Sequence, residues 1–473
     1  MHWTYKKPTF TISIAQKKHL NIRGDKSMTT TTQQGLRAAA PQHPASPRDG
    51  SSAPRTERVP TRIVAATVAG NAMEFYDFTT YAFFAVYIGK TFFPATTPLM
   101  SLLLSVAVFG VGFVTRPIGG VLIGAFADRV GRKPAMLLTI ALITVGTLGL
   151  AITPSYASIG IAAPIIVVLC RLVQGLALGG EVGPSTAFLI EIAPSNQRGL
   201  YGSWQLASQG VAALVAGVIG VLLTLSLTPD QMQAWGWRVP FLLGLLLIPI
   251  ALYLRRRMPE TLAHGGEKPA ASAPRAGIGS HSRLIVLAVL VVMGGTVSTY
   301  VANYMTTYAV TTLKLSPVIA MTATVIFGLA TLVGALLGGW LCDRHGRKPV
   351  MLWPRVALAL LTYPAFMLLT QYTSFFTLVC VTTLLAGLTG ISGAASLVAV
   401  PELFPSHVRA LGMSIAYAVG VSIFGGSTQL IVTWLISATG NPAAPALYVT
   451  VTSVIAALAM LALRETGDKP LAG

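Results

Sequence analysis

The sequence predicts an all-α polytopic membrane protein in which twelve transmembrane helices form two pseudo-symmetric six-helix halves. Three observations predict this fold. Of the 473 residues, 53% are hydrophobic and only 10% are charged, and the mean hydropathy is +0.68. Apolar segments of about 20 residues, enough to cross about 30 Å of hydrocarbon, recur along the chain. One basic turn also occurs twice between such segments.

The apolar segments form two groups of six, which predict the domain organisation. The first group, 62–254, has spans near 62–88, 99–127, 134–153, 161–190, 199–227 and 239–254. The second group, 284–463, has spans near 284–312, 318–341, 349–370, 375–400, 407–437 and 444–463. Residues 1–61 are polar and rich in Ser, Thr, Pro and Ala, which predicts a disordered tail. A polar linker at 255–283 separates the groups, and a short tail occupies 464–473.

The distribution of charge predicts the orientation in the membrane. Of the 33 Lys and Arg residues, only Lys90, Arg238 and Lys314 fall in the loops predicted to be external. Nearly all the others lie in the tails or in the junctions after even-numbered spans, so the positive-inside rule places both termini in the cytoplasm. The net charge of +18 therefore reflects membrane topology, and no nucleic-acid partner is expected.

The repeated basic turn joins the second and third spans of each half. Residues 124–134 return in register as residues 339–349, with Asp128, Arg129 and Arg132 matched by Asp343, Arg344 and Arg347. Each aspartate follows a helix at its C-terminal end, which is unfavourable for a carboxylate on that helix dipole. Its partner is therefore expected elsewhere, at an arginine or at the N-terminus of another helix.

A second repeated pattern supports an internal duplication. Glu191 and Arg198 precede the fifth span, and Glu402 and Arg409 occur with the same spacing at the eleventh. Two halves that repeat both patterns are typical of a duplicated transporter fold.

Charged residues inside membrane spans are costly, so each one is a candidate functional residue. Five lie deep, all in the first half: Glu74, Asp77, Arg116, Arg171 and Glu181. Two arginines beside carboxylates suit a site that takes an organic anion together with a proton. The alternative is that these residues form structural ion pairs. For any single residue this alternative has about the same weight as a functional role, but for the whole set it has much less.

Polar neighbours extend this candidate site. In the first span Asn71, Glu74, Asp77 and Tyr81 recur at helical spacing and form one stripe. In the fourth span Arg171, Gln174 and Glu181 share an arc, and Gln205 in the fifth span is added to the set.

The second half offers hydrogen-bonding groups in place of deep charges. Tyr300, Asn303 and Tyr304 share a face of the seventh span and are expected to line a cavity. The small and hydroxylated residues of the eleventh span are expected to pack against neighbouring helices. Arg355 lies near the start of the ninth span, from where it is expected to snorkel to the cytoplasmic surface.

The sequence contains no pattern typical of an enzyme or of a cofactor site. Cys170, Cys342 and Cys380 have neither metal-ligand spacing nor a disulfide framework. No nucleophile–base pair or phosphate-binding loop stands out, so no catalytic residue, metal or cofactor is expected. The coupling ion is expected to be a proton.

Both basic turns resemble the signature loop of the major facilitator superfamily, and the similarity covers 62–466. Within this region the resemblance to the metabolite:proton symporter family rests on residues 74–78, 171–175, 179–181, 198–204 and 424–426. That family takes up citrate and other tricarboxylates, 2-oxoglutarate, shikimate and osmoprotectants, and the citrate-type members are the most similar. The extended cytoplasmic coiled coil of the osmosensing members and the glycine-proline motif of antiporters are absent.

The resemblance implies a monomeric secondary transporter of the inner membrane that imports a carboxylate with protons by alternating access. The deep charges and their polar neighbours predict proton coupling at Glu74, Asp77 and Glu181, and they predict substrate binding at Arg116, Arg171, Gln174, Gln205, Tyr300, Asn303 and Tyr304. The resemblance offers the alternative that Arg171 mainly tunes a proton-carrying acid. The two kinds of repeated turn are the predicted gate, which includes Arg129, Arg132, Arg344, Arg347, Glu191, Arg198, Glu402 and Arg409. The resemblance also implies gating contacts in which Asp128 meets the N-terminal end of the eleventh span and Asp343 that of the fifth. The alternatives are an exporter or exchanger of similar compounds and, outside transport, a membrane sensor.

Overall fold

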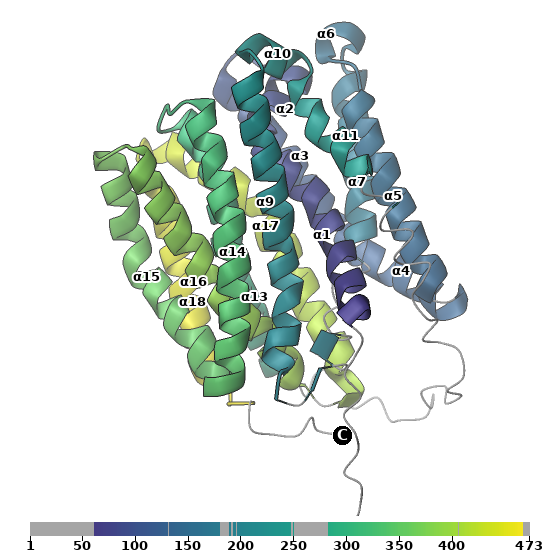
Figure 1. Ribbon diagram of the computed structural model, residues 1–473, viewed down its shortest axis with the longest axis vertical. Helices are drawn as coiled ribbons and strands as arrows, with labels where there is room; N and C mark the ends of the chain where they lie inside the picture. The colour runs from purple at the N-terminus through teal and green to yellow at the C-terminus, as the bar shows by residue number, and fades with distance from the viewer. Residues whose placement is uncertain are drawn as a thin grey trace, which may run out of the picture. The chain divides into compact units, whose positions relative to one another are not determined.

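The computed structural model describes residues 61–130, 132–179, 189–190, 193–194, 196–246, 249, 282–404 and 406–466. The side chains of residues 61–67, 124–125, 127–129, 132–133, 136, 406–411 and 414 lie outside this description. Within the described ranges every regular element is a helix, and most helices run alongside one another (Figure 1).

The helices follow the order of the predicted spans. Before the linker they are α1 (Thr61–Phe83), α2 (Ala85–Phe92), α3 (Pro98–Val114), α4 (Arg116–Val130), α5 (Arg132–Ile152), α6 (Tyr156–Ile159), α7 (Ala162–Gly179), α9 (Arg198–Ser226), α10 (Pro229–Ala234), η1 (Gly236–Arg238) and α11 (Val239–Leu246). After it they are α13 (Ser282–Thr311), α14 (Pro317–His345), α15 (Arg347–Gln371), α16 (Phe375–Glu402), α17 (Ser406–Thr439) and α18 (Ala444–Ala462).

Each of the twelve predicted spans coincides with at least one of these helices, which confirms the all-helical polytopic fold. Among the described residues, nine helices are long and apolar enough to cross a bilayer, and two shorter apolar helices are Leu137–Ile152 and Gly236–Leu246. The remaining span corresponds to α1, which carries the polar stripe. The first and second spans are each divided, at Phe84 and at Thr115.

Glycines allow α9 and α14 to lie side by side along their length (Figure 1). Gly199 faces the backbone of Gly339 near one end, and Gly210 faces Gly328 and Leu332 further along. A Cβ atom on Gly210 would lie 2.5 Å from the Leu332 amide nitrogen and 2.8 Å from the Gly328 carbonyl oxygen. Such close backbone approach is how helices associate in membranes, where burial of apolar surface gives little advantage.

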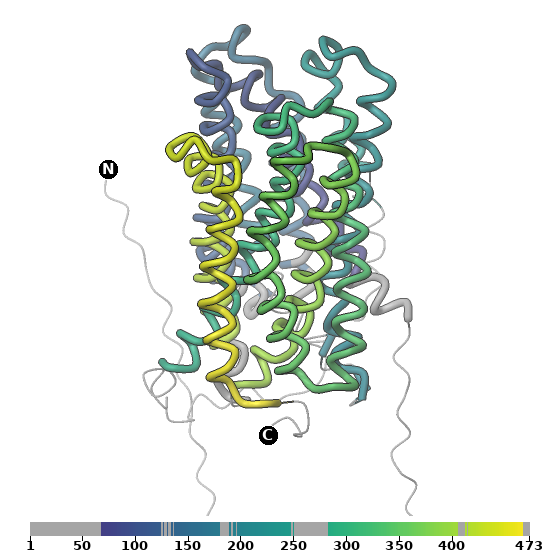
Figure 2. Tube along the Cα trace, turned by 90° about the vertical axis from the view of Figure 1, so that its left-hand side faces the viewer, coloured from purple at the N-terminus to yellow at the C-terminus, as the bar shows by residue number. Residues whose placement is uncertain are grey.

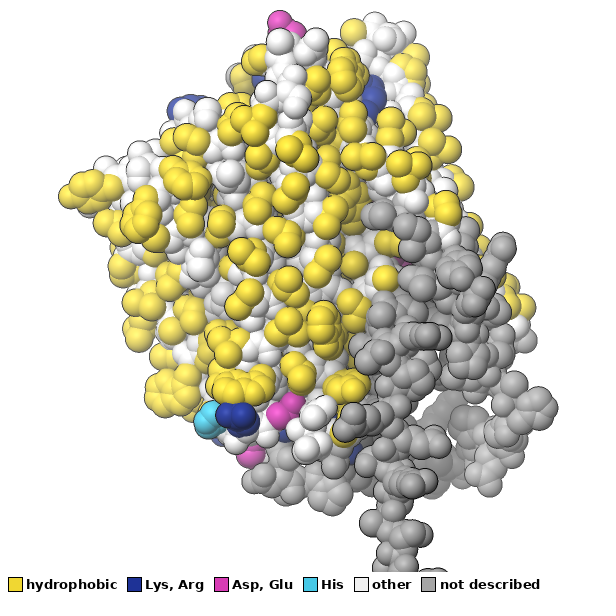
Figure 3. Space-filling model, in the orientation of Figure 1, with side chains coloured by type: hydrophobic (Ala, Val, Ile, Leu, Met, Phe, Trp, Pro, Cys, Tyr) yellow, Lys and Arg dark blue, Asp and Glu magenta, His cyan; other side chains and the backbone are white. Residues whose placement is uncertain are grey.

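The outer surface has the polarity expected of a protein in lipid. Hydrophobic side chains cover the middle of the face shown in Figure 3, and charged side chains gather near its ends. Residues from helices far apart in sequence contribute to this surface, among them Val121, Leu222 and Trp353. At the end of the described chain, α18 contacts both α13 and α15 (Figure 2).

Candidate functional site

The approach of α7 to α3 and α4 brings two buried arginines together. A Cβ atom on Gly175 would overlap the Gly112 carbonyl, and one on Gly179 would overlap the Arg116 carbonyl. These glycines therefore let the two backbones touch. Arg116, at the start of α4, and Arg171, in α7, are 6% and 1% exposed.

Asp77 is linked to Arg171 through the amide group of Gln174. Gln174 Nε2 donates to Asp77 Oδ2 at 2.6 Å, and Arg171 Nη1 donates to Gln174 Oε1 at 2.8 Å. Arginine can only donate hydrogen bonds, so the amide oxygen must face it and the NH₂ group must face the carboxylate. The predicted closeness of Asp77, Arg171 and Gln174 is present, with the glutamine lying between the two charges.

The second oxygen of Asp77 contacts a hydroxyl group of α5. Thr147 Oγ1 lies 2.8 Å from Asp77 Oδ1 and also 2.8 Å from the Ile143 carbonyl oxygen. A hydroxyl group has one hydrogen and two acceptor lone pairs. Thr147 can therefore donate to an ionised Asp77, or accept from a protonated Asp77 while its own hydrogen bonds Ile143.

Aromatic rings hold both guanidinium groups. Arg116 Cζ lies 4.6 Å from the Phe78 ring centroid and 4.0 Å from that of Phe113. Arg171 Cζ lies 4.4 Å from the Tyr81 centroid and 5.1 Å from that of Phe78, so the two cations share one ring. Cation–π contacts stabilise positive charge but leave the N–H groups available.

Four guanidinium nitrogens remain without a hydrogen-bond partner among the described residues: Nε and Nη2 of both Arg116 and Arg171. Buried N–H groups are normally satisfied, and charged ones are the most costly to leave unpaired. These N–H groups can therefore bind an anion that has several acceptor oxygens, because a guanidinium group can hold a carboxylate through two parallel hydrogen bonds.

A central cavity of about 90 Å³ lies beside these arginines. It is lined by Phe75 and Gln209 from the first group of helices and by residues of α13, α16 and α17 from the second. No charged side chain lines it within the described part of the chain. Tyr300 forms part of its wall, contacts Arg116, and packs 5.4 Å from the Phe113 ring. Arg116 thus lies behind the wall of the cavity.

A second cavity, of about 30 Å³, lies on the other side of α1. Both predicted proton-coupling residues of α1, Glu74 and Asp77, line it together with Thr147 and residues of α11. The carboxyl groups therefore face a different space from the one lined by Tyr300.

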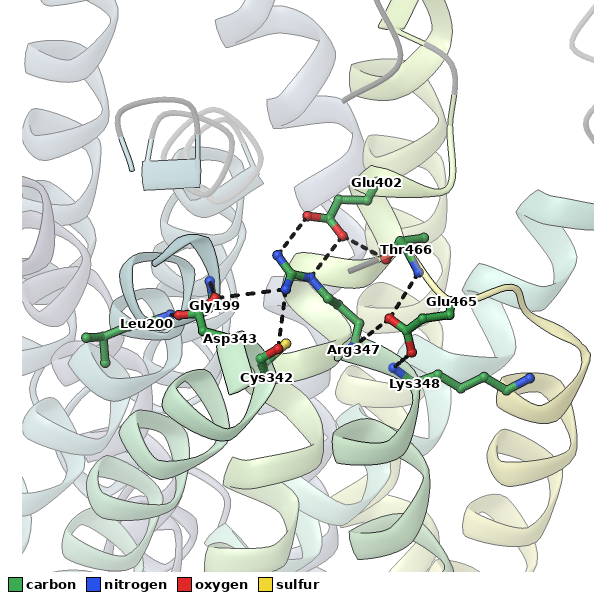
Figure 4. Close-up of polar contacts among 9 residues, drawn as sticks. All are labelled: Gly199, Leu200, Cys342, Asp343, Arg347, Lys348, Glu402, Glu465 and Thr466. Atoms are coloured by element: carbon green, nitrogen blue, oxygen red, sulfur yellow. Dashed lines mark hydrogen bonds and ion pairs between the residues drawn. The ribbon is translucent and has the colours of Figure 1, made fainter. Parts of the chain in front are cut away.

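At one end of α14, Asp343 caps the neighbouring α9. Asp343 Oδ1 accepts from the Gly199 amide at 2.7 Å, and Oδ2 accepts from the Leu200 amide at 2.8 Å (Figure 4). These N–H groups belong to the first turn of α9, where the helix dipole favours negative charge. The structure thus contains the expected contact between Asp343 and the N-terminal end of the fifth span.

Arg347, in the same turn, joins three segments of the chain. Its guanidinium group bonds Glu402 at 3.2 Å and the Cys342 carbonyl at 3.3 Å (Figure 4). Glu465 accepts from the backbone amides of Arg347 and Lys348 at 2.8 and 2.9 Å, and so caps the start of α15. This cluster ties α15, α16 and the segment after α18 together.

Several predicted residues lie outside the part of the chain for which side chains are described. They are Asp128, Arg129, Arg132, Glu181, Glu191 and Arg409. Arg198 is half-buried at the start of α9, and Arg344 packs on the Trp340 ring at 4.0 Å.

Three predicted substrate-binding residues make other contacts. Gln205 Nε2 donates to Asn71 Oδ1 at 2.8 Å and so joins α9 to α1. Asn303 accepts from Gln429 at 3.4 Å, and the Tyr304 hydroxyl accepts from Thr433 at 2.9 Å. The last two pairs join α13 to α17, and of the three residues predicted in the seventh span only Tyr300 lines the central cavity.

The expectation that Arg355 snorkels to the surface is wrong. Arg355 is 0% exposed, and its Nη1 donates to the Gly294 carbonyl and to Ser298 Oγ, both at 2.8 Å. Its Nη2 donates to Ser392 Oγ at 3.3 Å. Acceptors on α13 and α16 hold the side chain inside, about 12 Å along α15 from Arg347.

The sequence reasoning placed Tyr81 in the polar stripe but missed Thr147 and the phenylalanines that hold the arginines. A single hydroxyl in an apolar span carries no signal, since hydroxyls also bond their own helix. Phe109, Phe113 and Arg116 are spaced by four and three residues, and this spacing could have indicated a shared face.

A polytopic helical bundle with buried charges around a central cavity is the architecture of a secondary membrane transporter. The sequence matches the description "Sugar (and other) transporter" over residues 63–273 and "Major Facilitator Superfamily" over residues 287–472. It is 37% identical to the citrate-proton symporter of Salmonella typhi, over 87% of this chain and 96% of that protein. The chain belongs to the major facilitator superfamily, a superfamily of transporters, and is therefore not an enzyme.

Other relatives carry different substrate names. A putative proline/betaine transporter of Staphylococcus aureus (strain MSSA476) is 37% identical, over 87% of this chain and 90% of that protein. Among solved structures, the partially occluded inward open xylose transporter XylE from E. coli has a TM-score of 0.71 at 18% identity. That match covers 87% of this chain and 99% of the solved one, and it shows the shared fold.

Proposed function

We propose that the protein imports an organic di- or tricarboxylate, such as citrate, together with protons by alternating access. The observation that carries this proposal is the chain of hydrogen bonds from Arg171 through Gln174 to Asp77. It connects a cation whose Nε and Nη2 have no partner among the described residues to an acid that has a second, switchable partner. A group that binds an anion is thereby linked to a group that binds a proton.

Coupling follows from the charge on Arg171. When a substrate carboxylate engages the guanidinium group, its negative charge offsets the cation that stabilises ionised Asp77. Asp77 then takes up a proton on Oδ1 and donates a hydrogen bond to the Thr147 hydroxyl, while that hydroxyl donates its own hydrogen to the Ile143 carbonyl. Oδ2 keeps its bond from Gln174 in both states, so neither state leaves Asp77 without partners.

The aromatic rings favour a carboxylate over a zwitterionic osmolyte as the substrate, because their faces already contact the arginines. Rings that could cage a quaternary ammonium group already have guanidinium groups over their faces, at Phe78, Tyr81 and Phe113. The relatives named as citrate-proton symporters agree with this preference. The relatives named as proline/betaine transporters make an osmolyte the compound to test against it.

The remaining roles are part of the same proposal. The halves 62–254 and 284–463 move against each other, and the two basic turns open and close the cytoplasmic end through Asp128, Asp343 and their neighbours. Both termini are cytoplasmic, the membrane is the inner membrane, and a monomer suffices. The Asp343 cap on α9 supports the gating role because it joins helices of different halves.

Uptake into proteoliposomes tests the function. Labelled citrate, succinate and glycine betaine are offered with and without an inward proton gradient, and protein-free liposomes serve as the control. We expect the carboxylates to accumulate only when the gradient is present. Accumulation of betaine alone would contradict the proposed carboxylate substrate. In vesicles loaded with labelled carboxylate, release of the label that is driven by the inward proton gradient would indicate an exporter.

A further inference from the structure

Arg355 is a buried cation without an acidic partner among the described residues. The salt bridges recorded there join Arg347 to Asp343 and to Glu402, and neither of them involves Arg355. Its three acceptors are neutral. An isolated charge in a membrane interior is costly, so its presence there calls for a function.

The guanidinium group lies directly behind the wall of the central cavity. Gly295 of α13 lines the cavity, and a Cβ atom placed on it would meet one atom within 4 Å, Arg355 Nη2, at 3.6 Å. Glycine therefore leaves the space next to Arg355 Nη2 at this edge of the cavity free of a side chain.

Arg355 also keeps donors available. Nη2 has two hydrogens and one recorded acceptor, Ser392 Oγ, and Nε has no partner among the described residues. Both serines are oriented to accept from it, because Ser298 donates to the Gly294 carbonyl and Ser392 donates to the Met351 carbonyl. The positive charge is thus fixed in place.

The cavity has a cation behind each of two walls. Arg116 lies behind Tyr300 on the side of α4, and Arg355 lies behind Gly295 on the side of α15. No acidic side chain lines the space between them in the described part of the chain. A molecule with one carboxylate can neutralise one of these cations, whereas a polycarboxylate can approach both.

We propose that Arg355 is a specificity-determining residue that selects polyvalent anions and disfavours cationic groups in the central cavity, acting through the opening at Gly295. The proposal rests on the proposed function and sharpens it, since it assigns the second negative charge of the substrate to the second half of the molecule. An ammonium group at the same place would meet an unneutralised cation, so a zwitterion gains nothing there.

Substitution of Gly295 separates this role from a structural one. Gly295→Ala improves helix propensity and adds a methyl group at ordinary contact distance, so folding is retained. Gly387→Ala in α16 is the matched control, because a Cβ atom there has nothing within 4 Å. Arg355→Gln removes the charge and keeps a donor for the neighbouring acceptors.

Binding of citrate and glycine betaine to the purified full chain is measured by calorimetry for all four proteins. We expect Gly295→Ala and Arg355→Gln to weaken citrate binding about tenfold, the effect of one charge-assisted hydrogen bond. Gly387→Ala should bind like the wild type. Citrate binding that is equal in the wild type, Gly295→Ala and Arg355→Gln would overturn the proposal.

The betaine measurements distinguish failure of this proposal from failure of the proposed function. If the wild type binds betaine and no carboxylate, the proposed function is wrong. In that case tighter betaine binding by Arg355→Gln still supports Arg355 as the charge selector. Unchanged betaine binding by that variant would overturn the selector as well.

Discussion

At the scale of single residues, the site depends on which atoms can exchange donor and acceptor roles. Arg171 can only donate, the Gln174 amide has one group of each kind, and the Thr147 hydroxyl can do both. Asp77 therefore has one fixed partner and one adaptable partner. The adaptable partner makes the position suitable for repeated protonation.

Asp77→Asn should abolish accumulation driven by a proton gradient and leave substrate exchange across vesicles largely intact. Asparagine resembles the protonated acid, because its NH₂ group can donate to Thr147 while its oxygen accepts from Gln174. Uptake and counterflow in proteoliposomes measure the two activities, with Asp230→Asn in α10 as a control carboxylate. Concentrative uptake by Asp77→Asn would show that the proton is carried elsewhere, with Glu181 the next candidate.

Thr147→Val should slow proton-driven uptake roughly tenfold, since Asp77 loses a neutral hydrogen-bond partner in both protonation states. Thr147→Ser keeps the hydroxyl group and should retain most of the rate. Initial rates at several external pH values provide the measurement. Equal rates for the valine and serine variants would assign Thr147 a packing role only.

At the scale of elements, α9 and α14 form the most extensive helix–helix contact among the described residues. Glycines bring their backbones together, and Asp343 caps the end of one helix from the end of the other. The cap depends on this approach, because the carboxylate is short and both amides lie within 2.8 Å of it.

Asp343→Asn should slow transport and leave substrate affinity unchanged. Asparagine has one acceptor oxygen in place of two and no charge to interact with the α9 dipole, a loss of about 1 kcal/mol or more. Transport rate and equilibrium binding are measured on the same preparation, and thermal unfolding verifies the fold. A wild-type rate in folded Asp343→Asn would contradict the gating role.

At the scale of the whole molecule, the membrane potential constrains the transport cycle. Each net charge moved through 100 mV corresponds to about 2.3 kcal/mol, so an inside-negative potential opposes entry of a polyvalent anion. Protons must at least balance the charge of the anion.

We therefore expect an inside-negative potential, imposed with potassium and valinomycin at equal pH, to leave citrate uptake unchanged or to increase it. Vesicles with the ionophore and symmetric potassium are the control. Inhibition of uptake by the potential would mean that fewer protons than negative charges enter in each cycle.

The sequence predicted the parts of the molecule that follow from local patterns. Apolar length predicted the helices, and the repeated turn predicted that Asp343 finds its partner on another helix. Helical spacing brought Arg171 and Gln174 to one face, and their contact with Asp77 is present. The partner of Gln205 could not be predicted from local spacing. Asn71 lies 134 residues away in the sequence, and only the packing of α1 against α9 brings the two side chains together.

The burial of Arg355 shows the same limit. Its position about 12 Å along α15 from Arg347 is within reach of the membrane surface for a long side chain. Acceptors on α13 and α16 draw the Arg355 side chain inwards, and these acceptors lie near Arg355 only because the three helices pack together.

The fully buried Cys342 lies in the last turn of α14, where its carbonyl accepts from Arg347, so its thiol is shielded from water-soluble reagents while this end is closed. With Cys170 and the exposed Cys380 replaced by alanine, a water-soluble maleimide can react only after α14 and its neighbours separate at this end. The alkylation rate then reports the fraction of time that the end is open. Adding substrate at constant pH, which keeps the thiolate fraction constant, should change this rate in native membranes without any reporter group being introduced.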